Sequence, residues 1–169
     1  FAKKGDKWAA VRENGEERTD FIFDDVVRDE YGAAWLQERA FVKTGGGYRM
    51  IGGENLDYVG EQSFEQARAF GDSGYAAVCI AGKWGFTDTE GDVVIKPAYE
   101  DARSFSQGFA AVCTGGKWGY VDTEGRLVIP AEFETATDFS SSGTAAVRRF
   151  HPETGEPMWT LIELVMKEE

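Results

Sequence analysis

The side chains that could do chemistry in this chain fall into a few small groups, and paired acidic and basic residues come first. Glu65 stands three residues before Arg68, and Glu100 stands three residues before Arg103. Two carboxylates facing each other across a cleft would suit acid–base cleavage of a glycosidic bond. A glutamate and an arginine at this spacing more simply form a solvated ion pair, and a third similar segment carries Thr137 in place of the arginine. We therefore expect surface ion pairs here and no catalytic residue.

Thiol and imidazole groups are scarce. The two cysteines, Cys79 and Cys113, are too few for a disulfide framework or a structural zinc site. Because they occupy equivalent places in neighbouring copies of one pattern, other strands should separate them, and we expect two free, partly buried thiols. The single histidine, His151, has no serine or cysteine nucleophile beside it and is expected to be solvated. Neither a metal nor a cofactor is expected.

Three short motifs are similar to ion- or phosphate-binding loops. Asp88 and Asp122 each begin an Asp-x-x-Gly sequence, but calcium needs about six to eight oxygens from a denser acidic loop. Asp-x-x-Gly is itself a turn signature, because the aspartate caps the turn and the glycine supplies a positive φ. The glycine run 45–47 lacks the Gly-Lys-Ser/Thr of a phosphate-binding loop and precedes a strand-like segment. Turns are expected at all three places.

Tryptophan is the last group that could bind a ligand, by stacking on a sugar ring or a peptide. Trp84 and Trp118 lie 34 residues apart within two near-identical sequences, Gly-Lys-Trp-Gly-aromatic-x-Asp-Thr-Glu-Gly. A residue that recurs at such a period usually serves the fold, and a buried indole removes about 150–250 Å² from water. We therefore interpret both indoles as core between repeats, an interpretation that either indole pointing into solvent would overturn.

The period extends along the chain as a series of aromatic anchors. An Ala-Ala-Val strand and an aromatic–acidic segment recur around the two complete motifs in one order. Weaker copies of the motif occur at both ends of the chain, so that the series has five aromatic anchors: Trp8, Tyr48, Trp84, Trp118 and Trp159. The gaps between the outer anchors are longer, which indicates inserted loops and degenerate terminal repeats. The sequence predicts one repeat domain, residues 1–169, with units at about 4–43, 44–78, 79–112 and 113–147 and a closing strand at 158–166.

Within a unit, the pattern predicts three short antiparallel strands. Two strand-like runs flank the glycine turn 114–117, and the Asp-x-x-Gly turn leads to a third run that Pro130 ends. The segment 133–139 should return the chain to the next unit as a turn or a short helix. Since one meander cannot bury its own apolar face, neighbouring units must stack. We expect an all-β, solenoid-like array of three-stranded meanders, with a small β-propeller as the alternative.

Composition limits the class of protein. The chain has 169 residues, which suits one domain, and it has no apolar run long enough for a transmembrane helix. The net charge of −12 disfavours nucleic acid and anionic lipid as partners. Glycine is abundant, at 21 residues, as expected for many tight turns between short strands.

The repeated residues resemble the bacterial WG-repeat family, also called KWG repeats. The family pattern is Gly-Lys-Trp-Gly-aromatic-x-Asp-x-x-Gly followed by a Val/Ile-Ile-Pro strand, and residues 74–147 match it closely. Residues 4–43 and 44–78 match in part, with Arg49 and Gly52 in place of the Gly and Asp of the motif. The resemblance implies an all-β array found in secreted, surface-tethered and intracellular bacterial proteins. It also implies a non-catalytic interaction module without a general ligand.

We therefore expect a non-enzymatic binding module whose partner is another protein or a cell-envelope component, with no nucleic acid and no direct membrane insertion. A structural spacer without a ligand and a carbohydrate-active enzyme are the alternatives. A secreted or cell-surface location on a bacterium is favoured over the cytoplasm.

Inserted loops are where repeat arrays usually place partner-binding residues. Two insertions interrupt the pattern, at 27–40 and at 148–157. The residues expected to contribute to a partner surface are Trp35 in the first insertion and Arg148, Arg149 and His151 in the second.

Overall fold

The chain folds into strands, turns and loops. The computed structural model describes residues 1–164, among which there is no helix, so none is long and apolar enough to cross a membrane. The glycine turns explain the repeated hairpins: Gly115 and Gly116 have φ of +59° and +72°, which L side chains adopt only with strain. Two successive positive-φ residues give the tight turn that suits antiparallel strands. The predicted all-β class is confirmed.

The strands form five antiparallel sheets, numbered here in chain order, in which strands adjacent in sequence pair with one another. Sheets 1 and 2 are β1 (Ala2–Lys4) and β2 (Lys7–Ala9), then β3 (Asp25–Val26), β4 (Arg39–Thr44), β5 (Gly47–Gly52) and β6 (Asp57–Phe64). Sheet 3 contains β7 (Gln66–Phe70), β8 (Ala76–Ile80), β9 (Lys83–Thr87) and β10 (Val93–Tyr99). Sheets 4 and 5 are β11 (Asp101–Ala102), β12 (Phe109–Thr114), β13 (Lys117–Asp122) and β14 (Leu127–Phe133), then β15 (Thr135–Ala136), β16 (Thr144–Phe150) and β17 (Pro157–Glu163).

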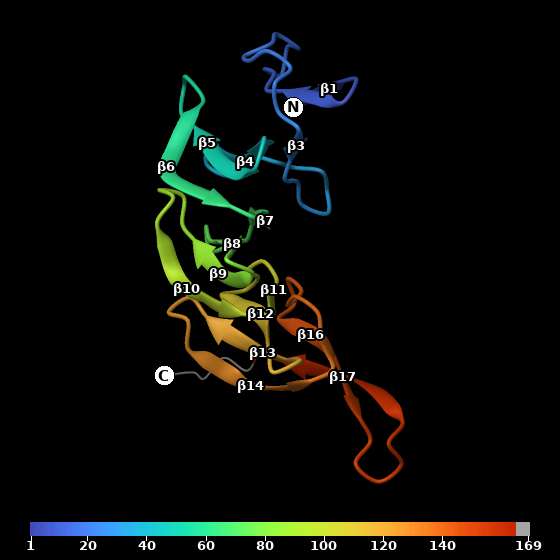
Figure 1. Cartoon of the computed structure of the whole chain (residues 1–169). Coiled ribbons are helices and arrows are strands. Elements are labelled where there is room, and N and C mark those ends of the chain that lie inside the picture. The colour runs from blue at the N-terminus through green and yellow to red at the C-terminus, as the bar shows by residue number, and fades with distance from the viewer. Residues whose placement is uncertain (165–169) are drawn as a thin grey trace, which may run out of the picture.

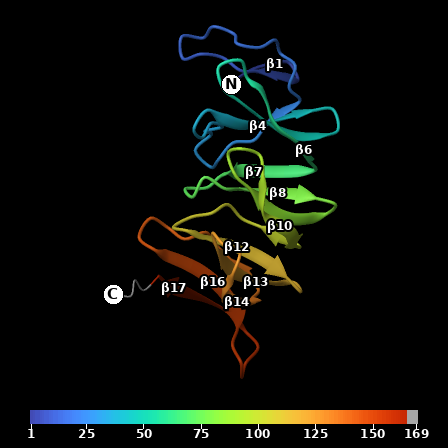
Figure 2. The same ribbon diagram turned by 90° about the vertical axis from the view of Figure 1, so that its left-hand side faces the viewer.

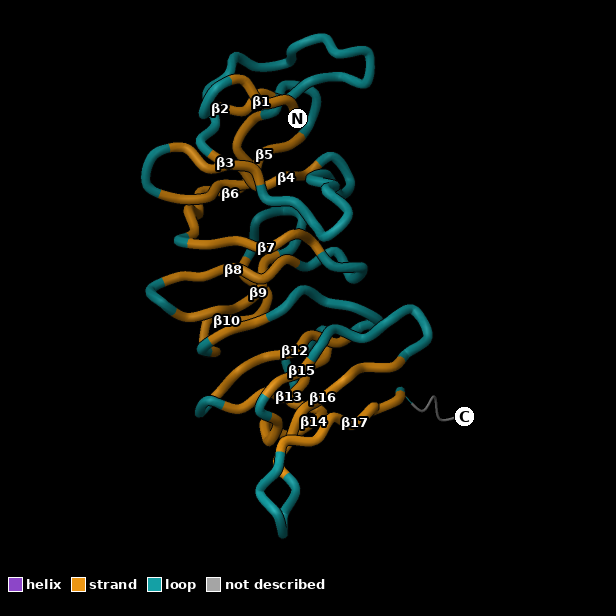
Figure 3. The backbone as a smooth tube through the Cα atoms, turned by 90° about the vertical axis from the view of Figure 1, so that its right-hand side faces the viewer, coloured by secondary structure: helices purple, strands orange, loops and turns teal. Residues whose placement is uncertain are grey.

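The sheets follow one another from one end of the molecule to the other, with sheet 1 and sheet 5 at opposite ends (Figure 1). The view turned by 90° shows the same succession (Figure 2). The array is therefore open and solenoid-like, as predicted, and does not close into a propeller. The hairpin between β16 and β17 projects beyond the last sheet (Figure 3).

Each complete sheet extends the predicted three-stranded meander by one short first strand. In sheet 5 the corresponding first strand is β15, which comes from the return segment 133–139; this segment forms neither a turn alone nor a helix. Phe133 ends β14 opposite Trp118, and Thr135 begins β15 opposite Arg148. The segment is extended because each of its halves pairs with the edge of a different sheet.

The predicted units and the observed sheets repeat at the same spacing along the chain, but the boundaries of the units do not coincide with the boundaries of the sheets. The predicted unit boundaries fall inside the second strand of each sheet, namely β4, β8, β12 and β16. The predicted closing strand corresponds to β17 up to residue 163, and its residues 165 and 166 lie outside the described residues.

The hydrophobic core is divided into layers between neighbouring sheets. Between sheets 3 and 4, the ring centroids of Phe86 and Phe105 lie 4.8 Å apart. Between sheets 4 and 5, those of Tyr120 and Phe139 lie 4.9 Å apart. In both layers, an aromatic residue on the third strand of one sheet packs against an aromatic residue that follows the first strand of the next sheet. Because burying one such side chain contributes about 1.5–3 kcal/mol, the layers hold the sheets together.

Candidate functional site

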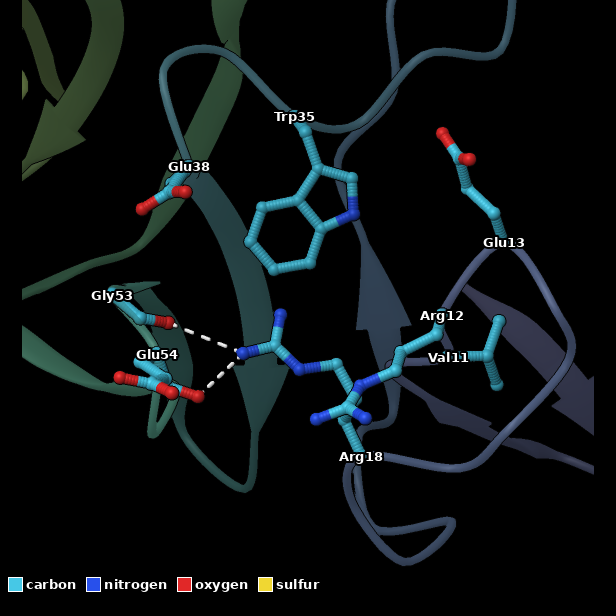
Figure 4. A pocket seen from close by; sticks show the side chains of 8 residues that line it. All are labelled: Val11, Arg12, Glu13, Arg18, Trp35, Glu38, Gly53 and Glu54. Atoms are coloured by element: carbon cyan, nitrogen blue, oxygen red, sulfur yellow. Dashed lines mark hydrogen bonds between the residues drawn. The ribbon is translucent and has the colours of Figure 1, made fainter.

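A pocket lies at the N-terminal end of the stack, between the loop that follows sheet 1 and the insertion 27–40 (Figure 4). Its volume is about 620 Å³, within the usual range of ligand sites. Three segments line it, from the loop after β2, the insertion and the turn between β5 and β6: Val11, Arg12, Glu13, Arg18, Trp35, Glu38, Gly53 and Glu54.

Trp35 forms the aromatic wall of this pocket. The insertion is held in shape by a turn in which Asp29 Oδ1 accepts hydrogen bonds from the backbone N–H of Tyr31 and Ala33, at 2.9 and 2.7 Å. The half-buried indole stacks on the ring of Phe1, with centroids 4.9 Å apart and planes 11° apart. Phe1 in turn packs edge-on against the buried Phe23 at 6.2 Å. One face of Trp35 is thereby fixed to the core.

The two arginines of the pocket have acceptors of their own. Arg18 Nη2 donates to the backbone carbonyls of Gly53 and Glu54, bridging two walls of the pocket (Figure 4). Arg12 Nη1 lies 3.0 Å from Glu16 Oε2. Both guanidinium groups therefore serve the structure of the loop and its contact with sheet 2.

The carboxylates of the pocket have no such partners. Glu13, Glu38 and Glu54 are exposed, and within residues 1–164 no lysine or arginine nitrogen lies within 4.0 Å of their carboxylate oxygens. The pocket therefore combines an aromatic wall with three carboxylates that have no ion-pair partner and with two arginines. Positive charge is attracted both to carboxylates and to the face of an indole.

Four of the predicted anchors occupy the same place in successive sheets. They lie on β2, β5, β9 and β13 and pack into the layer towards the following sheet: Trp8, Tyr48, Trp84 and Trp118. Trp84 is only 7% exposed, and the guanidinium of Arg68 covers its ring at 4.8 Å from the centroid. Arg103 lies 5.8 Å from the ring centroid of Trp118. These rings are occupied by the fold and are not free to stack on a sugar.

Trp159 shares the register of the other anchors but not their packing. It stands opposite Arg148, as Trp118 stands opposite Cys113. Its side chain is nevertheless 59% exposed, because no sheet follows sheet 5 within residues 1–164. The expected packing role is absent at this position.

The repeated glutamates bind glycine turns, so the expected Glu–Arg ion pairs are wrong. The carboxylate of Glu100 accepts hydrogen bonds from the backbone N–H of Gly115 and Gly116, at 3.1 and 2.9 Å. The bond from Gly116 above all lowers the pKa of Glu100. Arg68 pairs instead with Asp101 of the next sheet, at 2.9 Å. A tight turn offers fixed N–H donors, which a flexible arginine three residues away does not.

The Asp-x-x-Gly motifs form turns, as predicted. Asp122 Oδ1 accepts hydrogen bonds from the backbone N–H of Glu124 and Arg126, at 3.0 and 2.9 Å, and Gly125 has φ of +78°. Asp88 caps its own turn in the same way. No three His, Cys, Asp or Glu side chains of residues 1–164 are grouped so that they could hold a metal ion.

Both thiols are free, as predicted, and are more deeply buried than expected. Cys79 and Cys113 are 3% and 8% exposed. Burial raises the pKa of both thiols, and the nearby carboxylates of Glu65 and Glu100 add to the effect. Because the thiolate is the reactive form, neither cysteine is suited to nucleophilic chemistry.

The residues predicted for a partner surface lie at opposite ends of the molecule. Trp35 lies beside sheets 1 and 2, whereas Arg148 and Arg149 lie on β16 of sheet 5 and His151 directly follows that strand. His151 Nδ1 accepts hydrogen bonds from two backbone N–H groups of the hairpin between β16 and β17, at 3.2 and 3.3 Å. The histidine therefore shapes its own turn, and the two insertions do not form one surface.

Comparison with protein families matches residues 63–84, 84–118 and 118–149 in succession to the WG containing repeat. These three matches cover just over half of the chain. The chain belongs to the WG-repeat family. A search of curated protein sequences gave no match.

Two solved structures are similar to this WG-repeat chain at 14% sequence identity. They are Kluyveromyces lactis Hsv2, with a TM-score of 0.36, and Kluyveromyces lactis Hsv2 complete loop 6CD, with a TM-score of 0.35. Each match covers 73% of this chain, and 47% and 46% of the respective neighbour. The WG-repeat chain thus spans less than half the length of these proteins.

The pocket lies outside the matched WG repeats. All of its residues fall between positions 11 and 54, whereas the first match begins at residue 63. Sequence reasoning found Trp35, because the long gap between Trp8 and Tyr48 reveals an insertion. It missed the charged residues that line the pocket with Trp35, although the charged run 12–18 in the same gap was a signal that could have found Arg12, Glu13 and Arg18.

Proposed function

We propose that this WG-repeat chain is a non-enzymatic module that binds another protein, and that its N-terminal pocket receives a basic side chain of that partner. The observation that carries this proposal is that the three carboxylates lining the same pocket as Trp35 have no ion-pair partner within residues 1–164. The two arginines in the same pocket are already engaged with Glu16 and with backbone carbonyls.

The chemistry of the pocket favours lysine or arginine over other side chains. A cation over an indole face gains about 0.5–2 kcal/mol, depending on how far it is desolvated. A hydrogen bond between a cationic donor and Glu13, Glu38 or Glu54 adds a charge-assisted contact. The net charge of −12 attracts a basic partner over a longer range and speeds its association.

A binding role is also supported by how the repeats use their polar groups. The glutamates that could have formed a catalytic pair are hydrogen-bonded to glycine turns, and the thiols are buried. These residues stabilise the hairpins of the array. A spacer without a ligand, by contrast, gives no role to the unpaired carboxylates around Trp35.

The test is a titration of the isotope-labelled chain with blocked tripeptides that carry lysine, arginine or glutamate at the centre. We expect the lysine and arginine peptides to shift the indole N–H signal of Trp35 and the amides around the pocket. The glutamate peptide should not. Affinity should fall as salt is raised, because the carboxylates are exposed and their attraction is screened. Equal responses to all three peptides, or none, would contradict the proposal.

Two matched variants separate the pocket from general charge. Glu38→Gln should weaken binding about three- to tenfold, because it removes one charge-assisted contact. Glu156→Gln removes the same charge from the hairpin at the other end of the molecule and should leave binding unchanged. Both side chains are exposed, so both variants should fold normally.

A further inference from the structure

A second hollow, here called the inner hollow, lies on the side of the stack that carries the first strands. Its volume is about 490 Å³, and four successive sheets line it, through β7 and the segments that follow β3, β11 and β15. The first strands β3, β7 and β11 lie along one side of the stack, and β6, β10 and β14 lie along the other (Figure 1). Because four sheets share one hollow, the stack is curved and the first strands are on its inner side.

The lining of the inner hollow combines a repeated frame with a position that changes from sheet to sheet. Phe70, Phe105 and Phe139 stand at the same repeat position in sheets 3, 4 and 5, and each packs against another aromatic ring. The position directly before each phenylalanine carries three different residues: Ala69, Ser104 and Asp138. The layers require the phenylalanines, whereas the fold does not prescribe the position beside them.

Some charged groups of the inner hollow already have partners within the protein. Arg68 pairs with Asp101 at 2.9 Å. Asp72 Oδ2 accepts a hydrogen bond from the backbone N–H of Gln107 at 2.6 Å, and Asp29 caps the turn of the insertion. These groups hold the walls of the hollow in place.

Four other charged groups line the hollow without an ion-pair partner: Arg28, Glu30, Arg103 and Asp138. Within residues 1–164, no oppositely charged side-chain atom lies within 4.0 Å of any of them. Arg28 and Arg103 lie over indole rings, and Arg103 Nε is buried without an acceptor. The hollow therefore contains two unpaired positive groups and two unpaired negative groups.

Asp138 is influenced by charges from three other sheets. Solvent reaches its side chain, yet the surrounding protein desolvates the carboxylate enough to raise its pKa. Arg103 and Arg68 lower the pKa of Asp138, and Glu30 raises it. Glu30 follows the first strand of sheet 2, Arg68 lies on that of sheet 3, and Arg103 follows that of sheet 4. The inner hollow thus gathers one charged side chain from each of four sheets, and the arginines do not fully offset the desolvation of Asp138.

Two serine hydroxyls fix the spacing between these sheets. Ser104 Oγ donates to the carbonyl of Ala69 at 2.8 Å and joins sheet 4 to sheet 3. Ser106 Oγ donates to the carbonyl of Phe139 at 2.6 Å and joins sheet 4 to sheet 5. Since Phe139 directly follows Asp138, the second bond holds that carboxylate beside sheet 4. A site fixed in this way loses less entropy when a ligand binds.

A ligand of a single charge would satisfy only half of the unpaired groups. An anion would meet two carboxylates, and a cation would meet two guanidinium groups, so that each would also be repelled. A zwitterion can place its carboxylate on a guanidinium, which binds carboxylates through paired N–H donors, and its ammonium on a carboxylate. The volume of the hollow lies within the usual range of small-molecule sites.

We propose that the inner hollow binds a small zwitterion, namely an amino acid or a short peptide with a free ammonium and a free carboxylate. Arg103 binds the carboxylate and Asp138 binds the ammonium, while Arg28 and Glu30 add the same charges from the insertion. The site shares no residue with the N-terminal pocket and does not depend on the function proposed for that pocket.

The test compares alanyl-alanine with its N-acetyl form, which lacks the ammonium, and its amide form, which lacks the carboxylate. Added to the isotope-labelled chain, alanyl-alanine should shift the backbone amide signals of Ser104 and Ser106. Each blocked form should bind about tenfold more weakly, because one charge-assisted contact is lost. The proposal is overturned if alanyl-alanine causes no shift, or if either blocked form binds as tightly.

Two variants assign the two ends of the ligand. In Asp138→Asn, alanyl-alanine should bind no more tightly than its N-acetyl form, because the partner of the ammonium is gone. In Arg103→Gln, it should bind no more tightly than its amide form. Each comparison is made between peptides on one variant, so a change in stability does not imitate the result. If both variants keep the preference of the parent chain, the proposal is overturned.

Glu132→Gln and Lys96→Gln are the matched controls. They remove the same charges from exposed positions on β14 and β10, on the other side of the stack, and should leave binding unchanged. An equal loss of affinity in these controls would show general charge attraction and overturn the proposal. Shifts confined to the indole N–H of Trp35 would also overturn it, because they would place the dipeptide in the N-terminal pocket.

Discussion

At the scale of the residue, the repeat fixes where a side chain lies but not which group it contacts. Glu100 illustrates this, because its spacing from Arg103 indicates an ion pair while the nearer amides of the glycine turn bind it. Asp122, by contrast, was predictable, since its contacts lie two and four residues away in the same turn. Local hydrogen bonds can be inferred from sequence when both partners belong to one turn. Hydrogen bonds between residues far apart in the chain cannot.

Tyr120 gives a prediction at this scale. Its hydroxyl donates to the carbonyl of Thr137 at 2.8 Å, and burial raises its pKa to about 12. The unfolded value is about 10, so the folded protein holds this proton more tightly. The stability that this provides is complete below pH 10 and is lost as the pH rises from 10 to 12. Tyr120→Phe should therefore unfold about 1 kcal/mol more easily at pH 7, because it lacks one hydrogen bond.

The same variant should lose less stability than the parent chain between pH 10 and 12. Urea unfolding at pH 7, 10 and 11.5 measures both effects. Tyr48, whose pKa is also raised to about 12 by burial, titrates in both proteins and cancels in the comparison. Parallel alkaline losses in the two proteins would show that Tyr120 does not titrate with unfolding.

At the scale of the element, the hairpins were predictable and the return segments were not. Alternating strand formers and glycine turns specify the second and third strands of each sheet from local sequence alone. The segment 133–139 contains no such turn, so its sequence is compatible with a turn or a short helix. Its conformation is decided by two sheet edges that exist only after the neighbouring hairpins have formed.

The glycine of the Trp-Gly motif gives a prediction for the third strand. At Gly119 a Cβ would lie 2.5 Å from the carbonyl oxygen of Ile129 and 2.7 Å from the backbone nitrogen of Ala131. Both are backbone atoms, so Gly119→Ala should push β14 away from β13 and cost about 1–3 kcal/mol of unfolding free energy. Gly46→Ala is the control, because a Cβ there meets nothing within 4 Å and needs no positive φ.

Thermal and urea unfolding of both glycine variants provide the measurement. The Gly46 variant should lie within about 0.5 kcal/mol of the parent. If Gly119→Ala is equally neutral, the close approach of β14 does not constrain this position.

At the scale of the whole molecule, the stack has two unlike ends and a core split into layers. The N-terminal pocket is built by three segments up to about 40 residues apart in sequence, so only its insertion could be predicted. The exposure of Trp159 likewise depends on whether a further sheet packs against sheet 5, and the motif around this residue does not reveal that. Because each layer joins only neighbouring sheets, stability should behave as a sum of nearest-neighbour terms.

Phe139→Ala tests this view of the molecule. Phe139 is 3% exposed and packs against Tyr120 and Phe109 between sheets 4 and 5, so its removal should cost about 3–5 kcal/mol in that layer. Hydrogen exchange should become faster in β16 and β17, which then open locally, while β4 and β5 keep the protection of the parent chain. Their own layer, which includes Phe41 stacked on Phe70, is untouched. Equal acceleration in all strands would mean instead that the five sheets unfold as one cooperative unit.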